Sequence, residues 1–340
     1  MPTNIDVSKF DTSKVTNLYG MFQYCNSLES IDLSNFNTSQ VKDMSYLFDH
    51  CVSLKNLNLK NLDTNNLERM NGMFSNLESV TSLDLSNFKT YKVTGMANLF
   101  QNCFSLQYLD ISSFDTSLVF SMYRMFDSCR SLPYLNLKNF NTSLVQEFGY
   151  MFNECSSLTS IDLTSFNTPK AYTMYDMFDG CSSLTSLDLS SFNPDGVYNM
   201  NDMFNGCVSL KYLQLSENFK TKGLNFMSNM FKDCISLVSL DLSSFSTENV
   251  MYFDLAFNNC TSLTYLNVSS FRTTNAYKLS QMFYMCTSLT SLYLPYFSTN
   301  HIDTVGLASV FDGCKNLTLS LDKEKCENLK IPDYVNVIDI

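Results

Sequence analysis

The chain has 340 residues, of which 45% are hydrophobic and 16% are charged, and its formal net charge at pH 7 is −11. This apolar content suffices for a folded core and excludes intrinsic disorder, and the negative charge disfavours binding to nucleic acid, which depends largely on Lys and Arg. The two His residues, His50 and His301, leave little room for general-base or metal chemistry, so the composition points away from an enzyme.

Sequence motifs of membrane spans and of common active sites are also missing. No apolar run approaches the roughly 20 residues that a bilayer span needs. The first ten residues lack a basic segment followed by a long apolar core, so we expect no signal peptide in this chain. No GxSxG, HExxH or P-loop motif supplies a nucleophile, a zinc pair or a phosphate cradle. We therefore expect no catalytic residues, no cofactor and no metal.

A Phe that stands three residues before a Cys recurs along the chain and defines a repeat. Its spacing is 26 residues seven times, followed by 27, 26, 26 and 28, which gives twelve copies. A fixed period of this length is typical of a solenoid, in which each copy packs on the next. The twelve positions are Phe22, Phe48, Phe74, Phe100, Phe126, Phe152, Phe178, Phe204, Phe231, Phe257, Phe283 and Phe311.

Each copy also contains a pattern of the form LxxLxLxxF, seen for example over residues 28–36, 106–114 and 184–192. Its alternation of apolar and polar residues predicts a short strand with one buried face. The pattern is that of leucine-rich repeats, with Phe where many such repeats carry Asn. The 26-residue period also lies within the range of that architecture.

The segment after each strand has the apolar spacing of a helix. In the second copy the apolar residues fall at i, i+3, i+6, i+7 and i+10, which matches one stripe of a 3.6-residue period. A Thr-Ser pair such as residues 38–39 precedes the stripe and suits a helix N-cap. We therefore predict about three helical turns per copy. The stripe residues of the second copy are Val41, Met44, Leu47, Phe48 and Cys51.

These elements predict an α/β repeat solenoid of the leucine-rich-repeat type with about twelve 26-residue repeats. Its parallel β-sheet is expected on the concave side and its short helices on the convex side, with strands about 4.8 Å apart. We expect residues 1–316 to form the solenoid, without an N-terminal cap. The period breaks after Leu317, so residues 317–340 are predicted to be a C-terminal capping segment.

The Phe and Cys columns are predicted to form the core. Eleven of the twelve Cys occupy one repeat position, and Leu77 fills it in the remaining copy, which favours buried free thiols over metal ligands or disulfides. Cys326 lies outside the repeat, and its pairing with Cys314 is a hypothesis. Representatives of the core ladder are Phe48, Phe126, Phe178, Cys51, Cys129 and Cys181.

Outward-facing strand residues are the candidate ligand-binding residues. An exposed Tyr on a rigid sheet suits recognition, because it offers contact area at little entropic cost; alternatively, these Tyr residues merely fit a half-exposed strand. The neighbouring Asp column is a solvated polar ladder, a cation-assisted site or a face for a basic partner. The candidates are Tyr108, Tyr134, Tyr212, Tyr265, Tyr293, Asp84, Asp110, Asp162 and Asp188.

Two further features leave alternatives open. Residues next to the start of each predicted helix form an exposed convex patch if that turn is helical, and fold back if it is an irregular loop. Insertions near residues 217–224 and 301–307 are either recognition loops or tolerated length changes. The residues of the convex patch are Phe120, Tyr172, Tyr198, Met251 and Tyr277.

The unit FxTSxVxxMxxMFxxCxSLxxLDLS, present here over residues 114–129 and their continuation, closely resembles a known surface-protein repeat of about 26 residues. That repeat is known from mycoplasma lipoproteins and belongs to the wider BspA-like leucine-rich repeats. The resemblance covers residues 4 to about 317. It implies secreted or surface-anchored proteins that mediate adhesion and contact with host or neighbouring cells, and it supplies no catalytic residues.

Three functions follow as hypotheses. The first is a non-enzymatic extracellular or cell-surface adhesion protein that binds a protein or glycan partner through the face of the solenoid. The second is a structural protein that assembles end to end into a surface layer or filament. The third is capture of glycan or crystal surfaces by regularly spaced hydroxyl groups.

Overall fold

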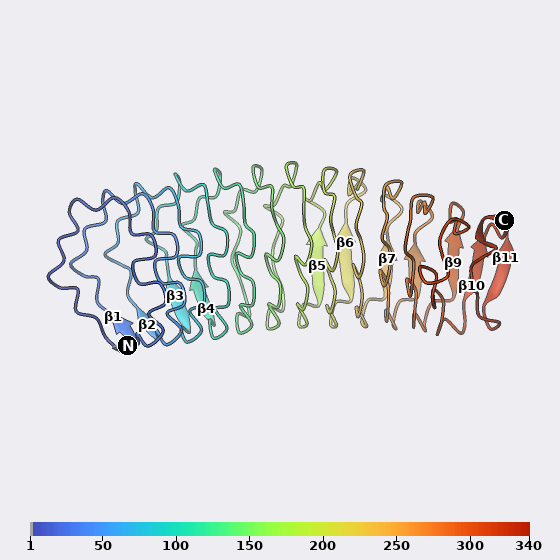
Figure 1. The fold of residues 1–340 in the computed structure, drawn as a ribbon, viewed down its shortest axis with the longest axis horizontal. Coiled ribbons are helices and arrows are strands. Elements are labelled where there is room, and N and C mark those ends of the chain that lie inside the picture. The colour runs from blue at the N-terminus through green and yellow to red at the C-terminus, as the bar shows by residue number, and fades with distance from the viewer. Residues whose placement is uncertain (1–2) are drawn as a thin grey trace. The chain divides into compact units, whose positions relative to one another are not determined.

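The computed structural model describes residues 3–340 and divides into two compact units, unit 1 (Met1–Thr168) and unit 2 (Pro169–Ile340). Within each unit the chain winds in successive coils that lie side by side, and the strands of neighbouring coils are adjacent (Figure 1). No helix among residues 3–340 has the length and apolarity needed to cross a membrane.

The strands of unit 1 pair in parallel, each with the strand one repeat later. β1 (Ser30–Ile31) pairs with β2 (Asn56–Leu57), and β3 (Ser82–Asp84) pairs with β4 (Tyr108–Asp110). The register places Asp84 directly beside Asp110. Equivalent side chains of successive copies therefore form rows, as the repeat predicts.

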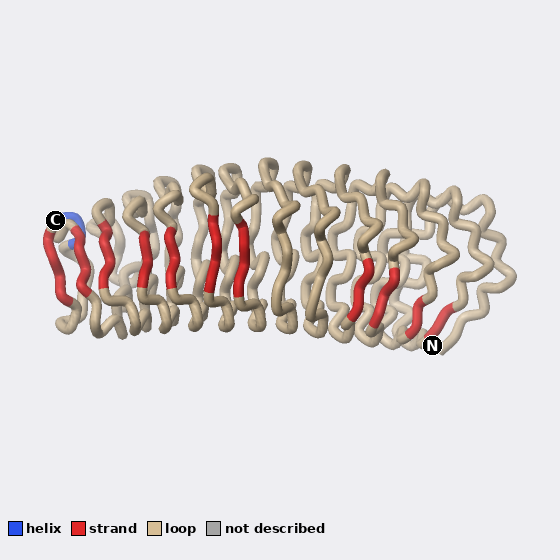
Figure 2. The backbone as a smooth tube through the Cα atoms, turned by 180° about the vertical axis from the view of Figure 1, so that it is seen from behind, coloured by secondary structure: helices blue, strands red, loops and turns tan. Residues whose placement is uncertain are grey.

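Unit 2 has the same parallel pairing and ends in a three-stranded sheet. β5 (Ser186–Leu189) pairs with β6 (Tyr212–Leu215), and β7 (Ser239–Asp241) pairs with β8 (Tyr265–Asn267). In the last sheet β10 (Thr318–Leu321) lies between β9 (Ser291–Leu294) and β11 (Asn336–Asp339), and the short 3-10 helix η1 (Glu324–Cys326) connects β10 to β11. Figure 2 shows the strands in red, with loops and turns making up most of each coil. The predicted parallel solenoid is confirmed.

No regular strand forms over residues 134–136 or 160–162, and in the first of these copies Pro133 removes a hydrogen-bond donor. In other copies the residue at this position donates its N–H to the preceding coil, as Gln107 does to the Thr81 carbonyl at 2.8 Å. Proline has no N–H, so this ladder hydrogen bond is missing. Leu135 and Leu137 nevertheless remain buried, so the coil keeps its place in the stack.

The predicted convex helices are wrong, because the described chain contains no α-helix. Each of these segments is instead a run of tight turns whose N–H groups alternate between two acceptors. The N–H of Leu47 donates to the Met44 carbonyl in the same coil at 3.2 Å. The next N–H, that of Phe48, donates to the Met73 carbonyl of the following coil at 3.1 Å. In a helix all of these N–H groups would donate within the same segment; here every second one donates to a neighbouring coil instead.

This alternation requires two residues in the left-handed region in each copy, four positions apart. Tyr46 and His50 have φ values of 57° and 60°, and Gly72 and Asn76 have 56° and 58°. A non-glycine residue in this conformation costs about 1–2 kcal/mol. The turn segment accepts that cost because each coil gains backbone hydrogen bonds to its neighbour.

The predicted core columns are buried and ordered into stacks. Phe126 lies between Phe100 and Phe152, with ring centroids 5.6 and 5.7 Å away and nearly parallel planes. In unit 2, Phe178 stacks on Phe204 at 5.7 Å. Stacked aromatic pairs add about 0.5–1.5 kcal/mol to the gain from burial. The representative residues Phe48, Phe126, Phe178, Cys51, Cys129 and Cys181 are fully buried.

The Thr residues predicted as helix N-caps instead join neighbouring coils. The buried hydroxyl of Thr142 donates to the Asn167 carbonyl at 2.7 Å and accepts the Asn167 N–H at 2.8 Å. Thr247 makes the same two bonds to the backbone of Arg272, at 3.1 and 2.7 Å. We call this arrangement the threonine clamp. The N-cap prediction is wrong because there is no helix to cap.

All twelve cysteines are free thiols, and the hypothesised Cys314–Cys326 disulfide is wrong. The Cys314 thiol donates to the Phe283 carbonyl at 3.0 Å, whereas the Cys326 thiol contacts the Phe297 carbonyl at 3.6 Å. Most of the column follows the first pattern, with each thiol donating to the carbonyl of a core Phe in the preceding coil. Burial raises the pKa of Cys51 to about 12, so the thiol stays protonated and unreactive.

Candidate functional site

The predicted Tyr residues project from the strands into solvent. The register places Tyr108 beside Ser82, Tyr212 beside Ser186 and Tyr265 beside Ser239. More than half of each predicted Tyr side chain is accessible, which leaves the rings available to a partner. The exposed fractions are 56% for Tyr108, 56% for Tyr134, 64% for Tyr212, 53% for Tyr265 and 54% for Tyr293. We call the surface formed by these Tyr residues and the neighbouring Asp column the strand face.

The Asp residues of the strand face hold the turn that follows each strand. The Asp84 carboxylate accepts the Ser86 N–H at 3.1 Å and the Ser86 hydroxyl at 2.6 Å. Asp162 binds Thr164 in the same way, at 3.1 and 2.6 Å. This side-chain-to-backbone bond two residues onward is typical of Asx turns. The sequence signal of this role is the Ser or Thr two positions after each Asp, and the predicted polar ladder did not take it into account.

Asp110 and Asp188 hold their turns in a similar way, because they accept the N–H groups of Ser112 and Ser190 at 3.0 and 2.8 Å. In each case one oxygen, Oδ1, makes the turn bond; Asp188 is exposed and Asp110 is partly exposed. The column is therefore both structural and available for contact.

Hydrogen bonding favours the ionised form of Asp84 and of Asp162. The Ser86 hydroxyl, followed by the Ser86 N–H, lowers the pKa of Asp84, and the hydroxyl and N–H of Thr164 lower the pKa of Asp162. The strand face is thus negatively charged at neutral pH. Across residues 3–340 no cluster of three or more His, Cys, Asp or Glu side chains is placed to hold a metal ion.

Two hollows lie on the strand face of unit 2. One, of about 290 Å³, is lined by residues of β5 and β6 that include Asp188, Tyr212 and Gln214, and by Ser239. The other, of about 430 Å³, lies between Tyr265 and Tyr293. The predicted residues Tyr212, Tyr265, Tyr293 and Asp188 therefore border concave features, to which a ligand could fit.

The predicted convex patch forms part of the irregular turn segments, yet its side chains do not fold back. Tyr172, Tyr198 and Tyr277 are 37%, 42% and 66% exposed, and Phe120 in unit 1 is 48% exposed. In unit 2 the rings of Tyr172 and Tyr198 stack at 6.1 Å. The alternative that an irregular loop would remove the patch is therefore wrong for these residues, although Met251 is only partly exposed.

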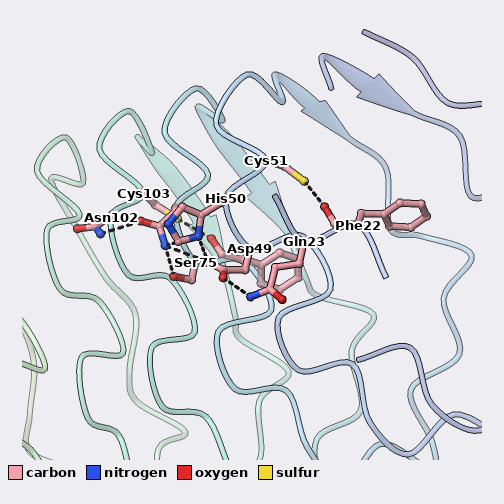
Figure 3. Close-up of polar contacts among 10 residues, drawn as sticks. Phe22, Gln23, Asp49, His50, Cys51, Ser75, Asn102 and Cys103 are labelled. Carbon is pink, nitrogen blue, oxygen red and sulfur yellow. Dashed lines mark hydrogen bonds and ion pairs between the residues drawn. The ribbon is translucent and has the colours of Figure 1, made fainter. Parts of the chain in front are cut away.

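A row of polar side chains next to the left-handed turn residues was not predicted. The buried Asp49 carboxylate accepts hydrogen bonds from Gln23 Nε2 at 2.8 Å and Asn76 Nδ2 at 2.9 Å, and His50 Nδ1 lies 2.9 Å away. Figure 3 shows these side chains meeting from neighbouring coils, with Asn102 extending the row. Because a buried carboxylate needs such donors, the row is a structural network between coils.

Structural comparison places the fold among leucine-rich repeat proteins. The crystal structure of a leucine-rich repeat protein from Bacteroides ovatus matches 99% of this chain and 83% of its own, with 19% sequence identity and a TM-score of 0.57. A leucine-rich cell surface protein from Faecalibacterium prausnitzii matches 80% of this chain and 83% of its own, with 17% identity and a TM-score of 0.29. The first likeness supports the fold, and the second is too weak to carry an argument. The sequence matches no curated protein at a significant level.

A family model described as "Mycoplasma protein of unknown function, DUF285" matches the sequence repeatedly. The matched segments are residues 2–83, 76–186, 134–235, 173–296 and 209–324, so they overlap and together cover nearly the whole chain. This agrees with the resemblance to mycoplasma-type and BspA-like repeats that the 26-residue unit carries. The chain belongs to the DUF285 family.

Proposed function

We propose that this chain is a non-enzymatic extracellular or cell-surface protein that binds a protein or glycan partner on a host or neighbouring cell through its strand face. The observation that carries the proposal is the set of exposed Tyr rings and ionised Asp carboxylates in register on a backbone fixed by hydrogen bonds between coils. A surface held rigid before binding loses little entropy when the partner docks.

The chemistry of the individual side chains supports binding over catalysis. The Asp carboxylates are held in turns by Ser or Thr, which lower the pKa of Asp84 and Asp162, whereas a general acid needs a raised pKa. Burial raises the pKa of Cys155, Cys207 and Cys260 far above neutrality, so these thiols do not act as nucleophiles. The exposed Tyr and Asp side chains of the strand face are therefore suited to contact with a partner.

The test is an array of glycans and of host surface proteins probed with the full chain. The double variant Tyr108→Ala/Tyr134→Ala removes two exposed rings of unit 1, and Tyr212→Ala/Tyr265→Ala removes two of unit 2. We expect at least one double variant to lose signal on every partner that the unchanged chain binds. Tyr277→Ala, at a Tyr that is 66% exposed and lies outside the strand face, is the matched control. Unchanged binding by both double variants would reject the strand face as the site.

A second candidate function is assembly of copies into a layer or filament, and the edge strand β11 favours it. β11 pairs in parallel with β10 and carries Ile338, which is 47% exposed. An exposed strand edge with apolar side chains is a template for pairing with another chain. Sedimentation velocity over a hundredfold concentration range tests this: assembly predicts larger species at higher concentration that Ile338→Lys removes. A strictly monomeric chain rejects it.

A further inference from the structure

From residue 186 to residue 267 the strand face of unit 2 repeats every two coils, although the sequence repeats every coil. The next coil carries Ser291 and Tyr293 and does not continue this pattern. A coil that carries Ser and Asp alternates with a coil that carries Tyr and an amide. The strand pairs show this directly: Ser186 lies beside Tyr212 and Asp188 beside Gln214 in β5 and β6. The next pair repeats it, with Ser239 beside Tyr265 and Asp241 beside Asn267 in β7 and β8.

The alternation sets the distance between neighbouring Tyr rings. Tyr212 and Tyr265 are two coils apart, which corresponds to about 10 Å at the usual spacing of parallel strands. This is the length of one disaccharide unit in an extended, β-linked polysaccharide. The strand face of unit 1 has no such alternation, because Tyr108 and Tyr134 belong to consecutive copies.

The faces of the two rings are open. Each Tyr stands beside a Ser of the paired strand, and a Ser side chain is too short to cover an aromatic ring. Tyr212 is the most exposed of the strand-face tyrosines, at 64%. An aromatic face carries partial negative charge and packs favourably against weakly positive C–H groups, such as those on the flat side of a pyranose ring.

Hydrogen-bonding groups border the rings on the same face. Asp188 and Asp241 each use Oδ1 to accept the N–H of Ser190 or Ser243 at 2.8 Å. Asp241 also accepts a side-chain hydrogen bond from Asn267, so Asp188 is the carboxylate that we expect to accept a ligand hydroxyl. The hollow of about 290 Å³ places Asp188 and Gln214 next to Tyr212. The hollow of about 430 Å³ places Ser291 and Asn267 next to Tyr265.

We propose that the strand face of unit 2 binds a neutral, extended, β-linked glycan, with alternate sugar rings on Tyr212 and Tyr265. This inference rests on the proposed function and names the class of ligand for part of that surface. A protein partner fits less well, because Ser and Asp separate the rings and leave no continuous apolar centre. An anionic polymer is disfavoured by the row of carboxylates.

Isothermal titration calorimetry of the full chain with cellohexaose, chitohexaose and maltohexaose tests the proposal. We expect binding of cellohexaose or chitohexaose, whose β-1,4 linkages keep the chain extended, and no binding of the curved maltohexaose. Tyr212→Ala and Tyr265→Ala should each weaken binding about tenfold, and Tyr→Phe at either position should keep it, because the ring makes the contact. The disaccharide should bind at least about tenfold more weakly than the hexasaccharide, because it cannot span both rings.

Tyr277→Ala is the matched control, since it removes a similarly exposed ring of unit 2, 66% accessible, that lies outside the strand face. The variant side chains are exposed, so thermal midpoints should stay unchanged, and circular dichroism checks this. The proposal is overturned if neither β-linked hexasaccharide binds, if both Ala variants bind normally, or if maltohexaose binds equally well. Failure of the glycan alone differs from failure of the proposed function: in the former case the Tyr212→Ala/Tyr265→Ala chain still loses a protein partner on the array.

Discussion

Asp43 and Arg69 in unit 1 occupy the same repeat position as Phe226 and Tyr252 in unit 2, and both pairs are joined by single parallel bridges between neighbouring coils. In unit 1 the two side chains form an ion pair at 3.0 Å, whereas in unit 2 they form an aromatic stack at 5.7 Å. The backbone is the same and the exposed chemistry is different. Backbone bonds between coils therefore set the fold, and outward-facing side chains are free to define what each unit contacts.

The strand face also combines a backbone arrangement that the two units share with side chains that differ between them. Both units place equivalent residues in register, yet in the strand column that contains Tyr108 the Tyr residues stand in consecutive copies in unit 1 and in alternate copies in unit 2. If this comparison is right, substitutions in the shared framework have equal effects in the two units, and substitutions of exposed residues have different ones.

The largest expected effect is the loss of a stacked core ring. Phe126→Ala in unit 1 and Phe204→Ala in unit 2 each remove a fully or almost fully buried ring between two stacked neighbours. Each should lower the free energy of unfolding by about 3–5 kcal/mol because a cavity remains. Urea denaturation followed by circular dichroism measures both. Costs that differ by more than about 2 kcal/mol would contradict a common framework.

The second-largest expected effect is the loss of a threonine clamp. Thr142→Val and Thr247→Val keep the side-chain shape and remove the hydroxyl, which leaves an N–H and a C=O of the next coil without their partner. We expect a loss of about 1–3 kcal/mol in each unit, measured as above. Thr185→Val, at an exposed Thr, is the control and should have almost no effect. A neutral result at both clamps would show that water replaces the hydroxyl.

The side-chain pairs that join neighbouring coils should separate the two units. Arg69→Ala breaks the ion pair with Asp43 and should cost about 1 kcal/mol at low salt, and less in 1 M NaCl. Tyr198→Ala removes the stack on Tyr172 and should cost about 1 kcal/mol at either salt concentration. Urea midpoints at two ionic strengths measure the difference. Equal salt dependence of the two variants would remove the proposed contrast between charged and aromatic positions.

Replacing a left-handed residue by Gly should stabilise the chain, whereas replacing a left-handed Gly by Ala should destabilise it. Glu154 in unit 1 has a φ of 54°, and Glu154→Gly should stabilise the chain by about 1 kcal/mol or less. Gly206 in unit 2 has a φ of 68°, and Gly206→Ala should destabilise it by about 1 kcal/mol. Thermal midpoints report both. Destabilisation by Glu154→Gly would mean that the unfolded-state entropy of glycine outweighs the relieved strain.

The smallest expected effect is a dependence on acid. Hydrogen bonds from Ser86 lower the pKa of Asp84 in the folded chain. Burial acts to raise the pKa of Asp241, but hydrogen bonds from Ser243 and Asn267 together outweigh it and lower that pKa. Because the folded pKa lies below the unfolded value, the stabilisation is present above about pH 4 and is lost as the pH falls through the folded pKa. The urea midpoint of the wild type should therefore fall toward those of Asp84→Asn and Asp241→Asn between pH 5 and about pH 2.5. A constant difference over that range would contradict the turn role.

The strands and the core could be predicted from the sequence, because one residue type recurs at one repeat position and only an in-register stack buries all the copies together. Phe126 and Cys129 are examples. The turn segments were wrongly predicted to be helices, since their apolar spacing fits a helix as well as a run of turns. The missed signal was the four-residue spacing of turn-forming residues, such as Gly72 and Asn76 or Asn98 and Asn102, which adopt the left-handed region.

The candidate site could be predicted in part. Exposure and register of the Tyr column follow from strand alternation, so Tyr108 and Tyr212 could be placed on the outer face. The second role of Asp84, as the acceptor in the turn after the strand, depends on local backbone geometry that the repeat pattern does not reveal. The row of amides around Asp49 was missed for the same reason, because its partners come from neighbouring coils.

The threonine clamp has a consequence for how such genes change length. Each clamp joins a coil only to the one after it, and the partner is backbone, which every copy possesses. Deleting or duplicating one whole 26-residue copy would therefore bring the same hydroxyl against the same kind of peptide group, with no compensating change elsewhere. Recombination between copies that carry this Thr can lengthen or shorten the protein, and so shift where the strand face is displayed, while the clamp geometry is kept; Pro194 stands in place of the Thr in one copy.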